Sequence, residues 1–269
     1  MKGKKTRRPM RLEVLASAVE KDVAELISQM HINTDAVVVN QCGGYAFGKI
    51  ETPGGCAKCF SMPERGVGLS RNTALLHASG DLVLFSDEDI TLASDYREKI
   101  LAAFESLRDA DMILFNVQVA PARRTYWNRE IHKVSWRNYG RYPAYSICAK
   151  LSSLRRANVQ YSLLFGGGAK YSNGEASLFL RDCLRAGLRV YAHTACIGKE
   201  RERESTWFSG YHEKFFHDRG VLYHHLYGKL ALPLSLRFLW AHKKLMCREI
   251  PVWQAFRIMR KGVREARGR

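Results

Sequence analysis

The stretch Gly68–Asp89, GLSRNTALLHASGDLVLFSDED, joins a helical pattern to a short apolar run that ends in three acidic residues. Its apolar residues first recur at helical spacing, Gly80-Asp81 interrupts the helix, and Leu82–Phe85 has the length of a buried strand. The acidic run Asp87–Asp89 should therefore follow a buried strand, and ligands bind beyond the carboxyl ends of strands in open α/β sheets. Carboxylates gathered at one place repel one another unless they share a cation. The stretch predicts an α/β fold with a divalent metal ion at this strand end.

The segments on either side continue the alternation of strands and helices. Up to residue 120, the patterns predict strands at 11–16, 35–40 and 111–119, helices at 19–30 and 92–107, and a short strand pair around residues 43–55. Beyond it they predict strands at 145–151 and 188–191 and helices at 176–186, 210–219, 234–247 and 252–267. Such alternation is typical of a doubly wound, mainly parallel sheet flanked by helices. The sequence thus predicts a basic tail (1–10), an α/β domain (11–220) and a basic helical extension (221–269).

Charge and composition limit the classes of function. The chain has 269 residues, of which 46% are hydrophobic, so it can bury a full core. Its net charge of +17 lies mostly at the two ends, because residues 1–11 and 236–269 together supply +14. Nucleic-acid binding through stacking needs basic and aromatic residues interleaved on one platform, so this distribution favours no nucleic-acid partner.

The sequence also gives an expectation of location. Because no run of about 18 apolar residues occurs, we expect no membrane-spanning helix. The basic N-terminus has no apolar segment after it, which argues against a secretory signal. An odd number of cysteines, seven, is consistent with reduced thiols. A cytoplasmic protein is expected.

The motifs of the opening stretch resemble the core of family 2 glycosyltransferases of the GT-A fold. They occur in the family's order as Gly68–Asn72 (GLSRN), Ala78–Asp81 (ASGD) and Ser86–Asp89 (SDED). The resemblance extends over roughly residues 12–220 and implies a nucleotide-diphospho-sugar transferase, Rossmann-like, with a nucleotide-binding half (11–120) and an acceptor half (121–220). Two further segments, Val39–Gln41 and Ser205–Tyr211, are similar to a bacterial subgroup associated with cell-surface polysaccharides such as capsule or exopolysaccharide.

This resemblance implies roles for the acids and for one arginine. Asp87 would face the nucleotide, and Asp87 and Asp89 would hold Mn²⁺ or Mg²⁺ against the donor's phosphates, where the metal acts as a Lewis acid. Arg71, expected at the start of a helix, would pair a phosphate through its forked guanidinium. The alternatives are an acidic start to a helix near Thr91 and a surface-exposed Arg71. By analogy with the fold, the remaining donor contacts are assigned to Ala16, Ser17 and Asn40.

The acceptor side of the resemblance departs from the family at one position. The later segment begins Gly174-Glu175-Ala176, where the family has G-E-D and its second acid is usually assigned as the base. A base must reach the attacking hydroxyl, so Glu175 is the candidate that remains. Its other reading is an acid that stabilises a helix N-terminus. Trp207 either stacks on an acceptor sugar or packs as a partly buried side chain.

We therefore expect a metal-dependent, inverting glycosyltransferase. It would move a sugar from a nucleoside diphosphate sugar, with UDP as the expected nucleotide, to a glycan or lipid-linked acceptor in cell-surface polysaccharide synthesis. The alternative is a catalytically impaired protein of the same fold that acts as a membrane-associated binding partner. The position that separates them is Ala176.

The C-terminal extension suggests contact with an anionic membrane. Apolar residues alternate there with lysine and arginine, as in helices that lie in the lipid interface. The first group is Leu236, Phe238, Leu239, Leu245 and Met246, and the second is Val252, Trp253, Phe256, Ile258 and Met259. The other reading is that these residues pack against protein and only the charges are solvated. The first reading predicts a peripheral protein on the inner face of the cytoplasmic membrane.

Overall fold

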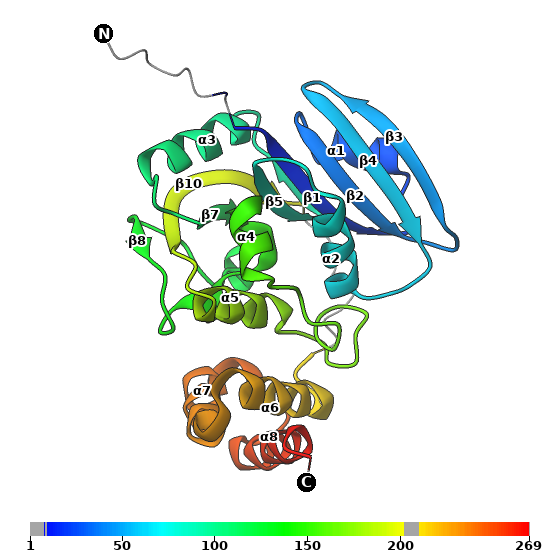
Figure 1. The fold of residues 1–269 in the computed structure, drawn as a ribbon. Coiled ribbons are helices and arrows are strands. Elements are labelled where there is room, and N and C mark those ends of the chain that lie inside the picture. The colour runs from blue at the N-terminus through cyan, green and yellow to red at the C-terminus, as the bar shows by residue number, and fades with distance from the viewer. Residues whose placement is uncertain (1–7, 9, 202–209, 269) are drawn as a thin grey trace. The chain divides into compact units, whose positions relative to one another are not determined.

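The computed structural model describes residue 8, residues 10–201 and residues 210–268. The chain forms two compact units, each assembled from separate stretches of sequence (Figure 1). Among the described residues, the first unit contains 8, 10–64, 70–159 and 183–201, and the second contains 65–69, 160–182 and 210–268.

The first unit is built on one mixed sheet with the strand order β3-β4-β2-β1-β5-β9-β7-β10-β6 and with β8 beside β10. β1, β2, β4 and β5 run parallel, and β9 lies antiparallel between β5 and β7. The bounds are β1 (Leu12–Val19), β2 (Asp35–Gln41), β3 (Ala46–Thr52), β4 (Gly55–Met62), β5 (Leu82–Asp87), β6 (Ile90–Leu92), β7 (Met112–Gln118), β8 (His132–Lys133), β9 (Ile147–Lys150) and β10 (Val190–Glu200). The central strands are near-continuous apolar runs because helices and loops cover both faces.

The helices of this unit are α1 (Val23–Gln29), α2 (Val67–His77, which begins in the second unit), α3 (Tyr96–Ser106) and α4 (Leu151–Ala157). Several predicted boundaries were wrong, among them the helix expected at 210–219, which runs from Glu213 to Tyr227. The first helix begins at Val23 rather than at residue 19, because β1 continues through Val19 and Asp22 caps the helix by accepting a hydrogen bond from the Glu25 N–H at 3.0 Å. The helix expected from residue 92 begins at Tyr96, because residues 90–92 form β6. The strand expected at 188–191 continues to residue 200.

A buried carboxylate on β1 holds the turn before β5. Glu13 is completely buried and accepts hydrogen bonds from the backbone N–H groups of Ser79 and of Gly80, the latter at 2.7 Å. The ammonium of Lys58 lies 3.1 Å from the other carboxylate oxygen. A Cβ at Gly80 would lie 2.8 Å from that of Glu13, so only glycine fits there. The ASGD motif therefore links β1 to the start of β5 through the buried carboxylate of Glu13.

We expect Glu13→Ala to lower the free energy of unfolding by about 3–5 kcal/mol, because it removes the carboxylate paired with a partly buried ammonium and leaves two N–H groups without their acceptor. Urea denaturation measures this change. The matched control is Glu51→Ala on the exposed edge strand β3, for which a change within about 0.5 kcal/mol is expected. Equal losses of stability in the two variants would refute the claim that Glu13 holds the turn before β5.

The second unit contains a bundle of three helices, α6 (Glu213–Tyr227), α7 (Ala231–Met246) and α8 (Val252–Ala266). Glycines let α6 and α8 approach closely: a Cβ at Gly220 would lie 2.8 Å from the Cα of Met259, and one at Gly262 would lie 3.0 Å from the backbone nitrogen of Val221. The bundle has its own core, formed by Phe215, Phe216, Tyr223, Ala231, Leu239, Ala255, Ile258, Met259 and Val263. Of the residues expected to face lipid, Leu239, Ile258 and Met259 thus belong to this core instead, and four others pack partly buried against it: Phe238, Met246, Val252 and Phe256.

Candidate active site

The acidic run lies at the carboxyl end of β5, as its sequence predicts. Asp87 is the last residue of the strand, and its carboxylate oxygen lies 2.7 Å from a guanidinium nitrogen of Arg71. The Arg71 side chain is only 4% exposed, whereas that of Asp87 is 29% exposed. A buried, forked guanidinium thus fixes the orientation of a carboxylate that solvent can reach. Arg71 lies in the second turn of α2 rather than at its start.

The middle acid is turned into the protein. Glu88 accepts a hydrogen bond from the backbone N–H of Val19 at 2.7 Å, and the ammonium of Lys21 lies 3.9 Å from its other oxygen. The side chain is only 10% exposed. Glu88 therefore joins the end of β1 to the end of β5, and the predicted metal ligands remain Asp87 and Asp89.

The turn that carries Asp89 is held from the end of β10. The backbone N–H of Arg201 donates to the carbonyl oxygen of Asp89 at 2.7 Å, and the Arg201 guanidinium donates to the carbonyl of Glu88. In the antiparallel pairing of β6 with β10, Ile90 lies opposite Glu200. These contacts use the backbone of the turn, so they fix its path without depending on the acidic side chains.

Two residues that sequence reasoning missed lie at this same edge. Burial raises the pKa of Tyr145 well above its usual range, and Tyr126 and the nearby carboxylates of Glu200, Asp87 and Asp89 raise it further. Tyr145 therefore keeps its phenolic proton at neutral pH and can donate a hydrogen bond. The side chain of Glu200 is only 7% exposed, and its carboxylate oxygen lies 2.9 Å from a guanidinium nitrogen of Arg123. The sequence carried no usable signal for Glu200, because the strand that it ends was predicted to stop at residue 191.

The other residues assigned to the donor lie at the ends of β1 and β2. Ser17 is almost buried and accepts a hydrogen bond from the hydroxyl of Ser70 at 2.9 Å, and Ala16 is completely buried. The amide of Asn40 accepts from the N–H of Lys21 at 3.1 Å and donates to its carbonyl at 2.8 Å. Asn40 thus shapes the loop after β1. Direct nucleotide contacts by Ala16, Ser17 and Asn40 stay predictions.

The acids at this edge fit a metal ion that is shared with a substrate. No group of three or more histidine, cysteine or acidic side chains is arranged to hold a metal in the described ranges 10–201 and 210–268. Two carboxylates, of Asp87 and Asp89, supply hard oxygen ligands at a partly exposed strand end. Mg²⁺ is commonly bound by one or two carboxylates together with substrate phosphates and water, and this donor set suits it.

Glu175 belongs to the second unit and is the first residue of α5 (Glu175–Arg185). It follows Gly174, whose φ of +107° is a conformation that glycine adopts readily. A Cβ at Gly166, in the preceding glycine run, would lie 3.1 Å from a carboxylate oxygen of Glu175. The absence of a side chain at Gly166 therefore makes room for this carboxylate. Ala176 is only 8% exposed. Trp207 lies outside the described residues.

A comparison with models of protein families matches residues 13–163 to the model described as "Glycosyl transferase family 2". The chain belongs to glycosyl transferase family 2. The match contains the Arg71–Asp87 ion pair and the turn that bears Asp89, so the acidic run lies inside the part of the chain that defines the family. A comparison with curated proteins found no match.

Solved structures of other glycosyltransferases share the fold. Residues 1–349 of TarS from S. aureus, in complex with UDP-GlcNAc, are 16% identical with a TM-score of 0.60, over 89% of this chain and 74% of that one. The mannosyltransferase PcManGT from Pyrobaculum calidifontis, in complex with GDP-Man and Mn²⁺, is 14% identical with a TM-score of 0.50, over 97% of this chain and 76% of that one. The predicted GT-A-type α/β fold with C-terminal helices is confirmed, and the protein is a family 2 glycosyltransferase.

Proposed function

We propose that this family 2 enzyme is a metal-dependent, inverting transferase that uses a UDP-sugar and extends a glycan or lipid-linked acceptor of the cell surface. The observation that carries the proposal is the strand end at which Arg71 fixes Asp87, with Asp89 two residues further on. Two solved relatives by fold support it, since TarS is in complex with UDP-GlcNAc and PcManGT with GDP-Man and Mn²⁺.

In the proposed reaction, acids at the end of β5 serve the donor and an acid of α5 serves the acceptor. Asp89 and Asp87 would hold the divalent metal, which would supply positive charge to stabilise the leaving diphosphate. The Arg71 guanidinium keeps Asp87 oriented before the donor arrives, so little reorganisation is needed on binding. A carboxylate oxygen of Glu175 takes the proton from the acceptor hydroxyl as that hydroxyl attacks the sugar. A single displacement of this kind inverts the configuration of the transferred sugar.

Calorimetry with UDP tests the donor site. We expect UDP to bind at least about tenfold more tightly with Mn²⁺ than with EDTA, because the metal links Asp89 to the phosphates. ADP and GDP, titrated in the same way, report on the choice of base. UDP affinity that is the same with and without Mn²⁺ would overturn the metal-dependent part of the proposal, and no UDP binding in either condition would overturn the choice of donor.

The second candidate is the catalytically impaired binding partner, which one observation favours. Ala176 stands where the family has its second acid, and its side chain is almost buried in α5. An impaired protein would bind UDP but turn over no donor sugar, and Ala176→Asp would raise its turnover. In an enzyme that uses Glu175, the same variant leaves turnover level or lowers it. A melting curve of the variant checks that the new carboxylate has not unfolded the unit.

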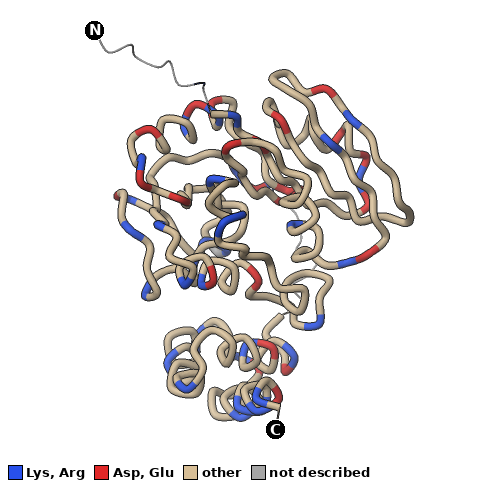
Figure 2. Tube along the Cα trace, viewed as in Figure 1, with Lys and Arg blue, Asp and Glu red and all other residues tan. Residues whose placement is uncertain are grey.

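We also propose that α7 and α8 dock the enzyme on an anionic membrane. After the bundle core is formed, Leu236, Trp240, Leu245 and Trp253 stay exposed. The Lys243 ammonium lies 4.8 Å from the Trp240 ring, and the Arg257 guanidinium lies 5.7 Å from the Trp253 ring. Basic residues recur along both helices (Figure 2). Exposed tryptophan beside lysine or arginine suits the interface of an anionic bilayer. No helix in the described part of the chain is long and apolar enough to cross a membrane.

Vesicle sedimentation tests this docking surface. The wild type should pellet with anionic vesicles but not with neutral ones, and raised salt should release it, because each basic residue near the surface contributes about 1 kcal/mol. Trp240→Ser combined with Trp253→Ser should weaken binding at least about tenfold, because both indoles leave the interface. Trp136→Ser, at an exposed tryptophan of the first unit, is the matched control. Equal binding by both variants would exclude α7 and α8 as the docking surface.

A further inference from the structure

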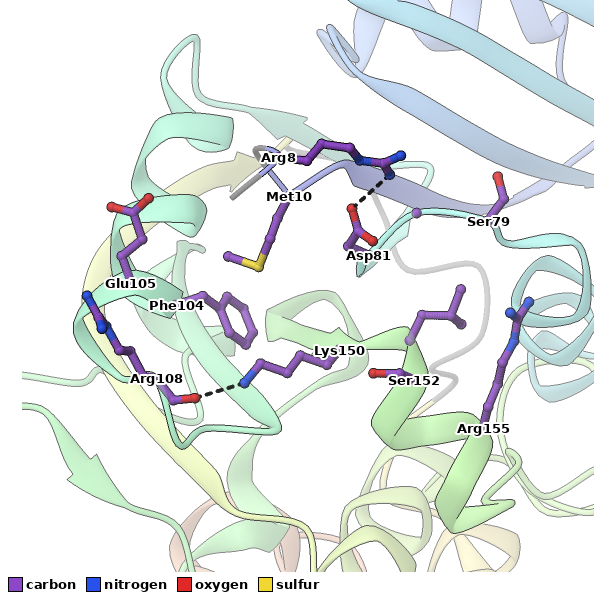
Figure 3. A pocket seen from close by; sticks show the side chains of 12 residues that line it. Arg8, Met10, Ser79, Asp81, Phe104, Glu105, Arg108, Lys150, Ser152 and Arg155 are labelled. Atoms are coloured by element: carbon purple, nitrogen blue, oxygen red, sulfur yellow. Dashed lines mark hydrogen bonds and ion pairs between the residues drawn. The ribbon is translucent and has the colours of Figure 1, made fainter. Parts of the chain in front are cut away.

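A cavity lies in the first unit, at the edge of the sheet where β1 and β5 begin (Figure 3). It has a volume of about 1090 Å³. Its walls come from the segment before β1, the turn before β5, the end of α3, and the junction of β9 with α4. A cavity of this size accepts a small organic molecule.

This cavity lies far from the candidate donor edge. Asp81, which immediately precedes β5, lines it, whereas Asp87 is the last residue of the same strand. Six residues of extended strand span about 20 Å. A ligand in the cavity is therefore not the nucleotide whose phosphates meet Asp87 and Asp89.

The lining carries an excess of positive charge. Four cationic side chains, of Arg8, Arg108, Lys150 and Arg155, line the cavity together with the acids Asp81 and Glu105. Asp81 is already engaged, because it lies 3.5 Å from the Arg8 guanidinium and accepts the N–H of Arg11 at 2.8 Å.

The arginines on the far side have no such compensation. The Arg155 guanidinium donates to the carbonyl oxygen of Ala78 at 2.7 Å, a neutral partner that orients the group but leaves its charge in place. In the described part of the chain, no carboxylate lies within 4.0 Å of the guanidinium of Arg108 or of Arg155. Arg155 is thus oriented at the cavity and Arg108 is exposed at its wall, each with its charge available to an anion.

The rest of the wall is apolar. Met10, the Phe104 ring and Leu151 line the cavity between the charged groups, and the Lys150 ammonium lies 5.9 Å from the centre of that ring. Figure 3 shows Met10 and Phe104 directed toward each other across the space. Apolar surface of this kind favours an anion that carries a hydrocarbon part over a small inorganic ion.

We propose that this cavity is a binding site for an organic phosphate, a phosphate ester whose hydrocarbon part lies against Met10 and Phe104. The doubly charged phosphate matches an excess of two positive charges in the lining. Forked guanidinium groups pair phosphate oxygens two at a time, which a single ammonium does not do. The ester is either a free metabolite or the headgroup of a lipid, and the chemistry of recognition is the same for both.

Calorimetry on the full-length protein tests the site with hexyl phosphate and inorganic phosphate as probes. Hexyl phosphate should bind with one-to-one stoichiometry and at least about tenfold more tightly than inorganic phosphate, because its chain is removed from water. Arg108→Gln combined with Arg155→Gln should weaken hexyl phosphate binding at least about tenfold. Arg108→Gln alone should also weaken hexyl phosphate binding, and this substitution breaks no side-chain contact of the described fold. UDP affinity should be unchanged in both variants, which separates this site from the donor site.

The matched control removes the same charge elsewhere in the first unit, by Lys49→Gln combined with Arg129→Gln, both exposed. It should bind hexyl phosphate as the wild type does. An equal loss in control and test variants would show nonspecific attraction and overturn the site, and so would undiminished binding in the test variants. Vesicles of phosphatidic acid, compared with phosphatidylcholine, distinguish the two sources of phosphate when every chain tested also carries Trp240→Ser and Trp253→Ser, which removes docking through α7 and α8. If the double variant loses vesicle binding, the site takes a lipid headgroup; if only hexyl phosphate binding is lost, it takes a free ester. If neither hexyl phosphate nor inorganic phosphate binds the wild type, the proposal is overturned.

Discussion

Glu175→Gln is expected to lower turnover by roughly two to four orders of magnitude, the scale on which general base catalysis contributes. The amide is close in shape to the carboxylate, so the space beside Gly166 is filled as before, but it takes no proton from the acceptor. UDP affinity should stay at the wild-type value, because the donor residues belong to the first unit. Turnover is measured at saturating donor and acceptor, and UDP affinity by calorimetry.

The matched control is Glu213→Gln. Glu213 is the first residue of α6 and Glu175 the first of α5, and both belong to the second unit. If Glu175 only stabilises the N-terminus of its helix, both substitutions cost up to about 1 kcal/mol of stability and leave turnover unchanged. A large fall in turnover in Glu175→Gln alone supports the base. Unchanged turnover in both variants assigns the base to another residue.

Asp89→Asn should lower turnover by roughly two to four orders of magnitude, because a metal acting as a Lewis acid is worth several kcal/mol. The substitution removes a charged ligand but keeps the shape of the side chain. The backbone contacts from Arg201 hold the turn in either case, so the fold should persist. In calorimetry, Mn²⁺ should no longer increase the affinity of the variant for UDP.

Asp109→Asn is the control for this experiment. The Asp109 carboxylate is exposed and accepts a hydrogen bond from the Tyr191 hydroxyl at 2.8 Å, in the loop before β7. Its loss of one negative charge equals that of Asp89→Asn, so both variants have the same change in net charge. If Mn²⁺ still tightens UDP binding in Asp89→Asn as much as in Asp109→Asn, Asp89 is not a metal ligand.

The sequence predicted the strands that are long apolar runs. It failed for strands that form only because they pair with a distant part of the chain. The apolar runs of β2, β5 and β7 were located within two residues, because a strand buried on both faces needs little context. β6 was missed because three residues carry no period of their own, and only pairing with β10 makes Ile90–Leu92 a strand. β10 was cut short because its later half alternates exposed and buried residues, and its register shifts relative to β7.

The site shows the same division. Asp87 and Arg71 were found from a motif, but their ion pair was not, since it joins two elements. Glu88 was grouped with its neighbours because sequence gives position and not direction, and its inward turn depends on the N–H of Val19. Glu200 and Tyr145 were missed because they reach the donor edge from parts of the chain that the motif does not include.

The pairing of β6 with β10 determines when, during synthesis of the chain, the donor edge can form. Ile90 leaves the ribosome about 110 residues before Glu200, its partner across the two strands, which at ordinary rates of translation is a delay of roughly 5–20 s. During that interval the turn bearing Asp89 has neither β10 beside it nor Arg201 to bind its carbonyl groups. The acids are synthesised early, but their geometry is completed only when residue 201 has emerged, so shorter nascent chains have no finished donor edge.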